Sequence, residues 1–199
     1  MLGTTKPAYA ASYSVVGCRE SGRTLVERLL GRLRGNGPGR VVHVIRDGRD
    51  AAIDAWDALE KGDRPLFRQP EKGSVPFFSV PFSFDDYVES FATHWVSFIE
   101  HVREAAQGHD DRYHELRYET LMSDPATAIV RLLEFLRIDA SPDSVAGCMQ
   151  RVNFAACTAG DWPHRFDAES AFRFDAVAGY LLQQLGYSEP TSTGLRRAA

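Results

Sequence analysis

Short apolar runs alternate along this chain with segments in which apolar residues recur every three or four positions. The short runs are typical of strands, and three are predicted, over residues 13–17, 41–45 and 113–118. The periodic segments predict helices over residues 24–34, 50–60, 84–106, 125–137 and 167–185. Because strands and helices alternate, we expect an α/β protein, a three-layer domain of the P-loop type in which helices flank a short parallel sheet.

The length of the chain predicts one domain over residues 1–199, and its composition predicts two irregular segments. A chain of 199 residues is long enough to bury a good core. Residues 1–11 are small and polar, so we expect them to be flexible. Residues 61–83 carry four of the ten prolines, which predicts a long loop.

The stretch from Arg40 to Trp56 combines a strand, a charged turn and a helix. Its β-branched run ends at Arg46-Asp47-Gly48-Arg49-Asp50, and an alanine-rich segment follows at once. Ligands of open α/β sheets bind just beyond the carboxyl ends of the strands. Guanidinium groups match phosphate oxygens two at a time, so the turn predicts an anion site. The alternative is that Arg46 and Asp50 pair with each other and cap the helix.

The charge distribution favours a small anionic ligand over a nucleic acid. The net charge of -4 and the pI near 5.9 are unlike those of a nucleic-acid-binding protein. Between Arg19 and Arg49, however, eight arginines face three acids, which gives this stretch +5 and leaves -9 for the rest. This uneven distribution of charge favours a polyanionic ligand at one edge of a sheet. The alternative is a solvated basic helix face, to which Arg28, Arg32 and Arg34 are assigned.

The cysteines and the hydropathy pattern predict a cytoplasmic protein. The three cysteines form no CxxC pair, so neither a disulfide framework nor a metal site is expected. The first fourteen residues lack the pattern of a signal peptide. No apolar run approaches the roughly 18 residues that a membrane span requires, so no membrane partner is expected.

Four stretches, in order, resemble the sulfotransferase family that uses 3′-phosphoadenylyl sulfate. The first runs from Gly17 to Leu25 and resembles the family's 5′-phosphosulfate loop, whose usual form is Lys or Arg followed by Ser-Gly-Thr-Thr. Ser21, Gly22 and Thr24 match this form. Glu20 replaces the basic residue and Arg23 replaces the first threonine, so Arg19 or Arg23 is expected to supply the positive charge.

The second stretch resembles the family's 3′-phosphate segment, in which an arginine follows an apolar strand. Arg46 takes the place of that arginine. A serine usually follows eight positions later, and here that position is Asp54. A carboxylate near a phosphate repels it, so either Asp54 turns away or the site holds its phosphate weakly.

The other two stretches lie in the second half of the chain. Residues 114–125, HELRYETLMSDP, resemble the family's "R-Y-E-x-L, two residues, D-P" block, in which Tyr118 and Leu121 are expected to pack and Asp124 to cap a helix. Residues 160–162, Gly-Asp-Trp, resemble the family's ending. The family's basic cofactor loop precedes that ending, but here Ala155, Ala156 and Cys157 stand in its place.

The resemblance implies transfer of a sulfuryl group from 3′-phosphoadenylyl sulfate, the co-substrate, to a hydroxyl or amine of a small-molecule acceptor. It implies a set of cofactor-binding residues and no metal. These residues are Arg19, Ser21, Gly22, Arg23, Thr24, Arg46 and Asp54.

The catalytic base is not identified by the resemblance. In the family it commonly lies among several dozen residues between the first helix and the Arg-Asp strand, and here that gap is only Gly35 to Arg40. Glu27 and His43 are the candidates. The alternative for Glu27 is a solvated partner for Arg23 or Arg28, and the alternative for His43 is a hydrogen-bonded core histidine. A catalytically inactive nucleotide-binding or interaction module therefore stands as the alternative function. The sequence predicts no oligomeric state.

Overall fold

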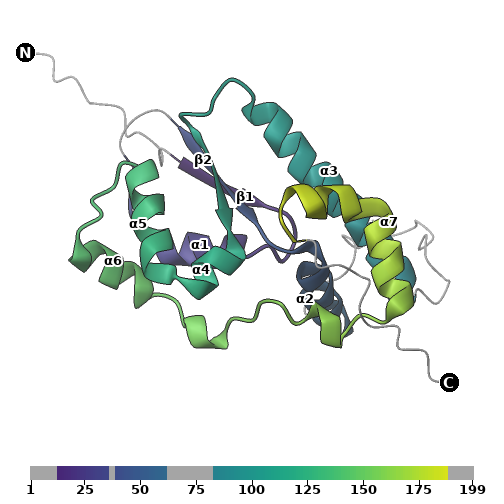
Figure 1. Cartoon of the computed structure of the whole chain (residues 1–199). Helices are drawn as coiled ribbons and strands as arrows, with labels where there is room; N and C mark the ends of the chain where they lie inside the picture. The colour runs from purple at the N-terminus through teal and green to yellow at the C-terminus, as the bar shows by residue number, and fades with distance from the viewer. Residues whose placement is uncertain (1–12, 36–38, 62–82, 188–199) are drawn as a thin grey trace, which may run out of the picture. The chain divides into compact units, whose positions relative to one another are not determined.

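The computed structural model describes residues 13–35, 39–61 and 83–187 (Figure 1). The predicted flexible segment 1–11 and nearly all of the predicted loop 61–83 lie outside the described residues. The elements are, in order, β1 (Tyr13–Gly17), α1 (Arg23–Leu30), β2 (Arg40–Ile45), α2 (Gly48–Glu60), α3 (Phe84–Ala106), β3 (Tyr113–Arg117), α4 (Tyr118–Ser123), α5 (Pro125–Phe135), α6 (Pro142–Met149), the 3₁₀ turns η1 (Phe154–Ala156) and η2 (Trp162–His164), and α7 (Ala168–Gln184). None of the described helices is long and apolar enough to cross a bilayer.

The chain divides into two compact units, each made of two separate segments. The first unit holds residues 1–46 and 98–159, and the second holds residues 47–97 and 160–199. The first therefore contains the three strands, and the second contains α2 and α7. Helix α3 begins in the second unit and ends in the first.

The sheet of the first unit is short and parallel, in the order β1-β2-β3. Tyr13 pairs with Arg40 at the start of β1, and Ile45 pairs with Arg117 at the end of β2. This confirms the predicted α/β fold with a parallel sheet. Because the strands are parallel and in this register, their carboxyl ends meet at one edge, where ligands of such sheets bind.

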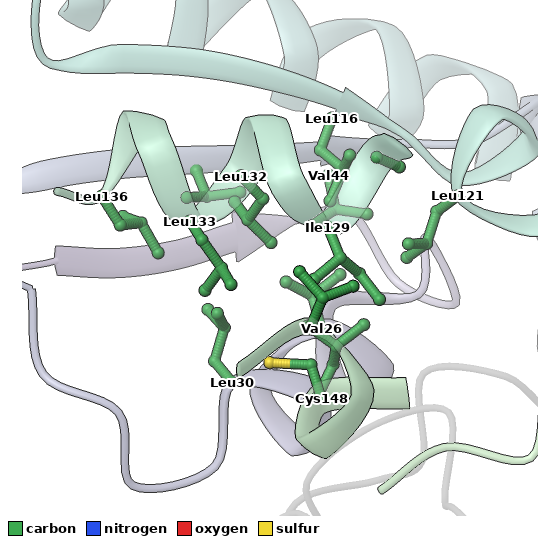
Figure 2. Close-up of a cluster of buried hydrophobic side chains, with 14 residues drawn as sticks. Val26, Leu30, Val44, Leu116, Leu121, Ile129, Leu132, Leu133, Leu136 and Cys148 are labelled. Atoms are coloured by element: carbon green, nitrogen blue, oxygen red, sulfur yellow. The ribbon is translucent and has the colours of Figure 1, made fainter. Parts of the chain in front are cut away.

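One face of this sheet carries the hydrophobic core of the first unit. Val42, Val44 and Leu116 pack there against helices α1, α4, α5 and α6 (Figure 2). The helices contribute buried residues at helical spacing, which are Val26, Leu29, Leu30, Leu121, Ala128, Ile129, Leu132, Leu133, Leu136, Val145 and Cys148. Burial of a side chain such as Leu or Ile contributes about 1.5–3 kcal/mol, so this face holds the unit together.

The opposite face of the sheet is covered by the last turns of α3 and is partly polar. His43 lies there with its ring 6.0 Å from that of Phe98. Arg103 donates two hydrogen bonds to Glu115, at 2.7 and 2.8 Å. With helices on both faces, the first unit is three-layered, as the alternation of elements predicts.

The second unit is built around aromatic contacts between α2, α3 and α7. The rings of Trp95 and Phe174 lie 6.1 Å apart, and Gly48 opens α2 directly against both. A Cβ at Gly48 would lie 2.7 Å from either ring, so only glycine permits this approach. Asp47 caps the helix by accepting a hydrogen bond from the Arg49 backbone N–H.

Several element boundaries differ from the sequence predictions. Helix α1 ends at Leu30 rather than at residue 34, because Gly31 has a φ of 56° and its N–H bonds to the carbonyl of Glu27. The third strand ends at Arg117, and Tyr118 opens helix α4, which was not predicted. Helix α6, with Pro142 in its first turn, was also missed. Helix α2 begins at Gly48, two residues early, because the cap is Asp47.

Candidate functional site

The loop between β1 and α1 has the backbone of an anion-binding turn. Its residues Glu20 and Gly22 have positive φ values of 54° and 91°. The Ser21 N–H bonds back to the carbonyl of Cys18 at 3.2 Å. Alternating right- and left-handed residues turn successive N–H groups inward, and the following helix presents the positive end of its dipole. Burial raises the pKa of the Cys18 thiol to about 11, so this residue of the loop is uncharged at neutral pH.

Two side chains of this loop bury polar atoms without a partner. Ser21 is 2% exposed, and its Oγ, like Nη2 of Arg19, has no hydrogen-bond partner in the described structure. Gly17 leaves the space for Ser21, because a Cβ at position 17 would overlap the Ser21 Oγ. Since buried polar groups are nearly always hydrogen-bonded, a hydroxyl and a guanidinium left in this state fit a bound phosphate or phosphosulfate group.

Arg46 follows β2 and is tied to the same loop. Its Nη1 donates to the backbone carbonyl of Glu20 and its Nη2 to that of Thr158, both at 3.1 Å. The guanidinium lies over the Tyr118 ring, 4.6 Å from the centroid. Arg46 is only 4% exposed. These contacts fix a cation beside the loop within the first unit.

Tyr118 belongs to this site, although sequence reasoning assigned it only to packing. Its ring supports Arg46 and also lies against Gly22, where a Cβ would come within 2.5 Å of the ring. Tyr118 directly follows β3, at the edge of the sheet where β1 and β2 also end. That position was the available signal, since a ligand site was already predicted at this edge.

The remaining loop residues begin helix α1. Arg23 and Thr24 are exposed in its first turn. Glu27 forms an exposed ion pair with Arg23, with Arg23 Nε and Glu27 Oε1 3.2 Å apart. The structure thus pairs Glu27 with Arg23, one of the two partners expected in the alternative interpretation.

His43, the other candidate base, lies in a buried polar network. Its Nδ1 is 2.7 Å from the Tyr113 hydroxyl, which donates to Glu115 at 2.8 Å. Because that hydroxyl proton goes to Glu115, His43 carries its own proton on Nδ1. Nε2 is buried and has no partner in the described structure. Burial lowers the pKa of His43 to about 4, against the opposing effect of Glu115. His43 is thus a neutral, hydrogen-bonded core histidine.

Glu115 is the charged centre of that network. Burial alone would raise the pKa of its carboxyl group, but hydrogen bonds from Arg103 and Tyr113 lower it below its usual value. The same surroundings raise the pKa of Tyr113, first by burial and then by its hydrogen bond to Glu115. The network therefore holds one ion pair and two neutral rings.

The second half of the charged turn has a structural task in the second unit. The Asp47 carboxylate accepts two hydrogen bonds from the Arg49 guanidinium, at 3.0 and 2.7 Å. Arg49 also donates to the carbonyl of Tyr187 and lies over the Trp162 ring, 3.8 Å from its centroid. Asp50 accepts the backbone N–H groups of Gly160 and Trp162, at 2.5 and 2.8 Å. Asp50 thus holds the Gly-Asp-Trp segment, and the helix cap assigned to it in the alternative interpretation belongs to Asp47.

Asp54 also belongs to the second unit. It lies half-buried on α2, two turns after the Asp47 cap. Its place opposite a 3′-phosphate stays a prediction.

Comparison with known proteins gives the family. The family model described as "Sulfotransferase family" matches residues 38–142, which is more than half of the chain. The chain therefore belongs to the sulfotransferase family. The match begins before β2 and includes Arg46, β3 and Tyr118.

Individual relatives agree with this family. Cytosolic sulfotransferase 17 of Arabidopsis thaliana is 27% identical over 100 residues, which are 49% of this chain and 26% of that protein. The chain thus matches about a quarter of the length of this relative.

Solved structures show the same fold. Mouse sulfotransferase SULT7A1, in complex with PAP, matches 89% of this chain and 87% of its own, with a TM-score of 0.65 and 13% identity. Retinol dehydratase, in complex with androsterone and the inactive cofactor PAP, matches 80% of this chain and 50% of its own, with a TM-score of 0.52 and 22% identity.

Proposed function

We propose that this chain transfers a sulfuryl group from 3′-phosphoadenylyl sulfate to a hydroxyl or amine of a small-molecule acceptor. The observation that carries this proposal is the pair of buried polar atoms, Ser21 Oγ and Arg19 Nη2, in the loop that Arg46 contacts. Family membership supplies the reaction type. The structures matched in complex with PAP support the choice of nucleotide.

In this proposal the two ends of the nucleotide are held within the first unit. The 5′-phosphosulfate lies in the loop, where Arg19, Ser21, Arg23, Thr24 and the N–H groups around Gly22 bind it. The 3′-phosphate is assigned to Arg46. By resemblance, Asp54 stands at the sequence position of the family's serine. Because Arg46 is bonded to the Glu20 carbonyl, the distance between the two phosphate sites is fixed by the protein.

During sulfuryl transfer, negative charge develops on the leaving group, and in this proposal the loop stabilises that charge. The acceptor oxygen or nitrogen forms a bond to sulfur while the bond from sulfur to the 5′-phosphate oxygen breaks, and the electron pair stays on that phosphate. Arg19, Ser21 and the loop N–H groups are positioned to stabilise the resulting charge. The acceptor proton leaves to a base. We assign this role to Glu27, which lies in α1 one turn from the loop and is exposed.

The proposed location is the cytoplasm, and the proposed partner is a small-molecule acceptor. A cytosolic sulfotransferase among the relatives supports both. The three cysteines are free thiols, two of them buried, which suits a reducing compartment.

A transfer assay tests the proposal. The chain is incubated with sulfur-labelled 3′-phosphoadenylyl sulfate and a panel of phenols, sugars and amines, and labelled product is counted. We expect turnover with at least one acceptor. Arg46→Ala should lower turnover at limiting donor, whereas Arg28→Ala, an exposed arginine of α1, should not. Glu27→Gln should cost about 10²–10⁴ in rate, as loss of a positioned base does. Glu134→Gln, on α5, is its matched control.

Nucleotide binding without transfer to any acceptor would contradict the proposed activity and favour the inactive nucleotide-binding module. Transfer that survives Glu27→Gln would contradict only the choice of base.

A further inference from the structure

The first unit contains a cavity between the sheet and the end of α3. Its volume is about 350 Å³, which lies within the range of roughly 300–1,000 Å³ typical of small-molecule sites. Val16 of β1 and Val41 of β2 form one wall, and Val102 and Ala105 of α3 form the other. These residues give the hollow an apolar interior.

The polar groups around this cavity are basic or neutral. His101, His109, Arg112 and Tyr113 line it, and no aspartate or glutamate is among the described residues that do so. Arg112 pairs with Asp111 only loosely, at 3.7 Å with both side chains exposed. Such a pair contributes about 0–1 kcal/mol, so Arg112 can turn to another anion at little cost.

The wall that carries these bases is fixed by backbone hydrogen bonds. The Val41 N–H donates to the Arg112 carbonyl at 2.7 Å, which ties the turn to the sheet. The Arg112 N–H donates to the His109 carbonyl at 2.8 Å, and the His109 N–H donates to the Ala106 carbonyl at 3.0 Å. The last of these bonds occupies the carbonyl of Ala106, the final residue of α3.

The cavity is separate from the proposed nucleotide site. Its apolar lining reaches Val16, near the carboxyl end of β1, but its polar groups His109 and Arg112 precede β3, whereas the phosphate loop and Arg46 follow carboxyl ends. The five residue steps from Val41 to Arg46, just past the end of β2, span roughly 16 Å of extended chain. An anionic group held at Arg112 therefore lies at the opposite edge of the sheet from the phosphate site.

We propose that this cavity is a binding site for a small amphipathic anion, with its apolar part between the sheet and α3 and its carboxylate at Arg112, His109 and His101. A medium-chain carboxylate has this chemistry. The apolar interior favours the hydrocarbon chain of the ligand, and the basic lining favours its negative charge. The proposal does not depend on the sulfotransferase activity.

The test is a calorimetric titration of the full chain with decanoate, below its micelle concentration, repeated with decyltrimethylammonium and with decanol. We expect decanoate to bind at one site, more tightly than either of the other two. Binding should persist in protein saturated with 3′-phosphoadenosine 5′-phosphate. Arg112→Gln should weaken it about two- to fivefold, the effect of losing one exposed charge contact. Arg131→Gln, on the exposed side of α5, should leave it unchanged.

A second pair of variants tests the location. Ala105→Trp should fill the cavity and abolish decanoate binding, whereas Ala126→Trp, an exposed alanine of α5, should have no effect; melting temperatures verify that both variants fold. Equal binding of the ammonium compound, competition with the nucleotide, or unchanged binding by a folded Ala105→Trp variant would overturn the proposal.

Discussion

Arg46 and Arg49 stand three residues apart in one charged turn, are equally buried, and have different partners. The Arg49 guanidinium donates hydrogen bonds to the Asp47 carboxylate and to the Tyr187 carbonyl. It also lies over the Trp162 ring. Arg46 is oriented by the neutral carbonyls of Glu20 and Thr158 and by the Tyr118 ring. The contacts of Arg49 hold segments of the second unit together, whereas those of Arg46 hold its guanidinium beside the loop after β1 in the first unit.

Buried polar groups of the molecule differ in whether protein partners satisfy them, and we propose that the unsatisfied ones bind the ligand. Asp47, Arg49 and Asp50 have protein partners that anchor the segment from Gly160 to Trp162 and the end of α7. Ser21 and Arg19 keep buried polar atoms without partners in the described structure. Variants of the first group should therefore lose stability, and variants of the second should lose nucleotide affinity.

The largest effect is expected for Arg49→Ala. Removing one partner of a buried ion pair leaves the other charge uncompensated, at a cost of about 3–5 kcal/mol in the free energy of unfolding. Urea denaturation measures this cost. Arg165→Ala is the matched control, because Arg165 pairs with Asp57 near the surface and should cost less than about 1 kcal/mol. Equal losses for the two variants would contradict the structural role of Arg49.

His43 extends the comparison to a group buried by the sheet. Its pKa is about 4 in the folded chain, below the ordinary value of about 6.5. The unfolded chain therefore takes up a proton first as the pH falls, and stability present above pH 6.5 is lost towards pH 4. The loss attributable to His43 is about 3 kcal/mol. Unfolding free energies of wild type and His43→Gln, compared between these pH values, measure it; the same pH dependence in both would show that His43 does not cause it.

Arg46→Ala tests the assignment of this arginine to the 3′-phosphate. We expect 3′-phosphoadenosine 5′-phosphate to bind better than AMP, and the variant to lose most of that difference, about 1.5–3 kcal/mol for a charge-assisted contact. Titrations of both nucleotides into both proteins give the four affinities required. A variant that keeps the full preference would remove Arg46 from the 3′-phosphate site.

Ser21→Ala isolates the loop with a smaller effect. Because its Oγ has no partner, unfolding free energy should change by less than about 0.5 kcal/mol, while nucleotide affinity falls by about 1 kcal/mol. Ser170 offers the opposite control: it is buried and donates to Asp85 at 2.6 Å, so Ser170→Ala should lose stability and keep affinity. If the two serines exchanged these behaviours, the separation of roles would be wrong.

The smallest effect is expected for Asp54→Ser. If Asp54 takes the position of the family's serine, replacing its carboxylate should tighten binding of 3′-phosphoadenosine 5′-phosphate by less than about 1 kcal/mol and leave AMP unchanged. Asp57→Ser, on the same helix, serves as the control. Tighter binding of both nucleotides, or of neither, would show that position 54 does not face that phosphate.

Local sequence patterns predicted the framework of this fold. The bounds of β1 and α3 agree with the prediction. A β-branched run, and apolar residues that recur at helical spacing over 23 residues, are strong local signals. The end of α1 was missed because the glycine at residue 31 competes with a pattern that continues to Leu33. Helix α4 was missed because six residues are too few to show a helical period.

The sequence predicted the location of the candidate site but not how it is assembled. Placing Arg46 and the loop at one sheet edge required only the order of strands and turns. The Thr158 carbonyl that holds Arg46 lies 112 residues away in the chain, and Asp50 lies 110 residues from Gly160. No local pattern reports such contacts. The different roles of Arg46 and Arg49 were therefore visible only in the folded structure.

The most direct test of the account is a calorimetric titration of the unmodified chain with 3′-phosphoadenosine 5′-phosphate and, separately, with AMP. We expect saturable binding of both at one site, with the 3′-phosphorylated nucleotide tighter by about tenfold or more, the equivalent of a single charge-assisted contact. Equal affinities, or no binding of either nucleotide, would contradict it.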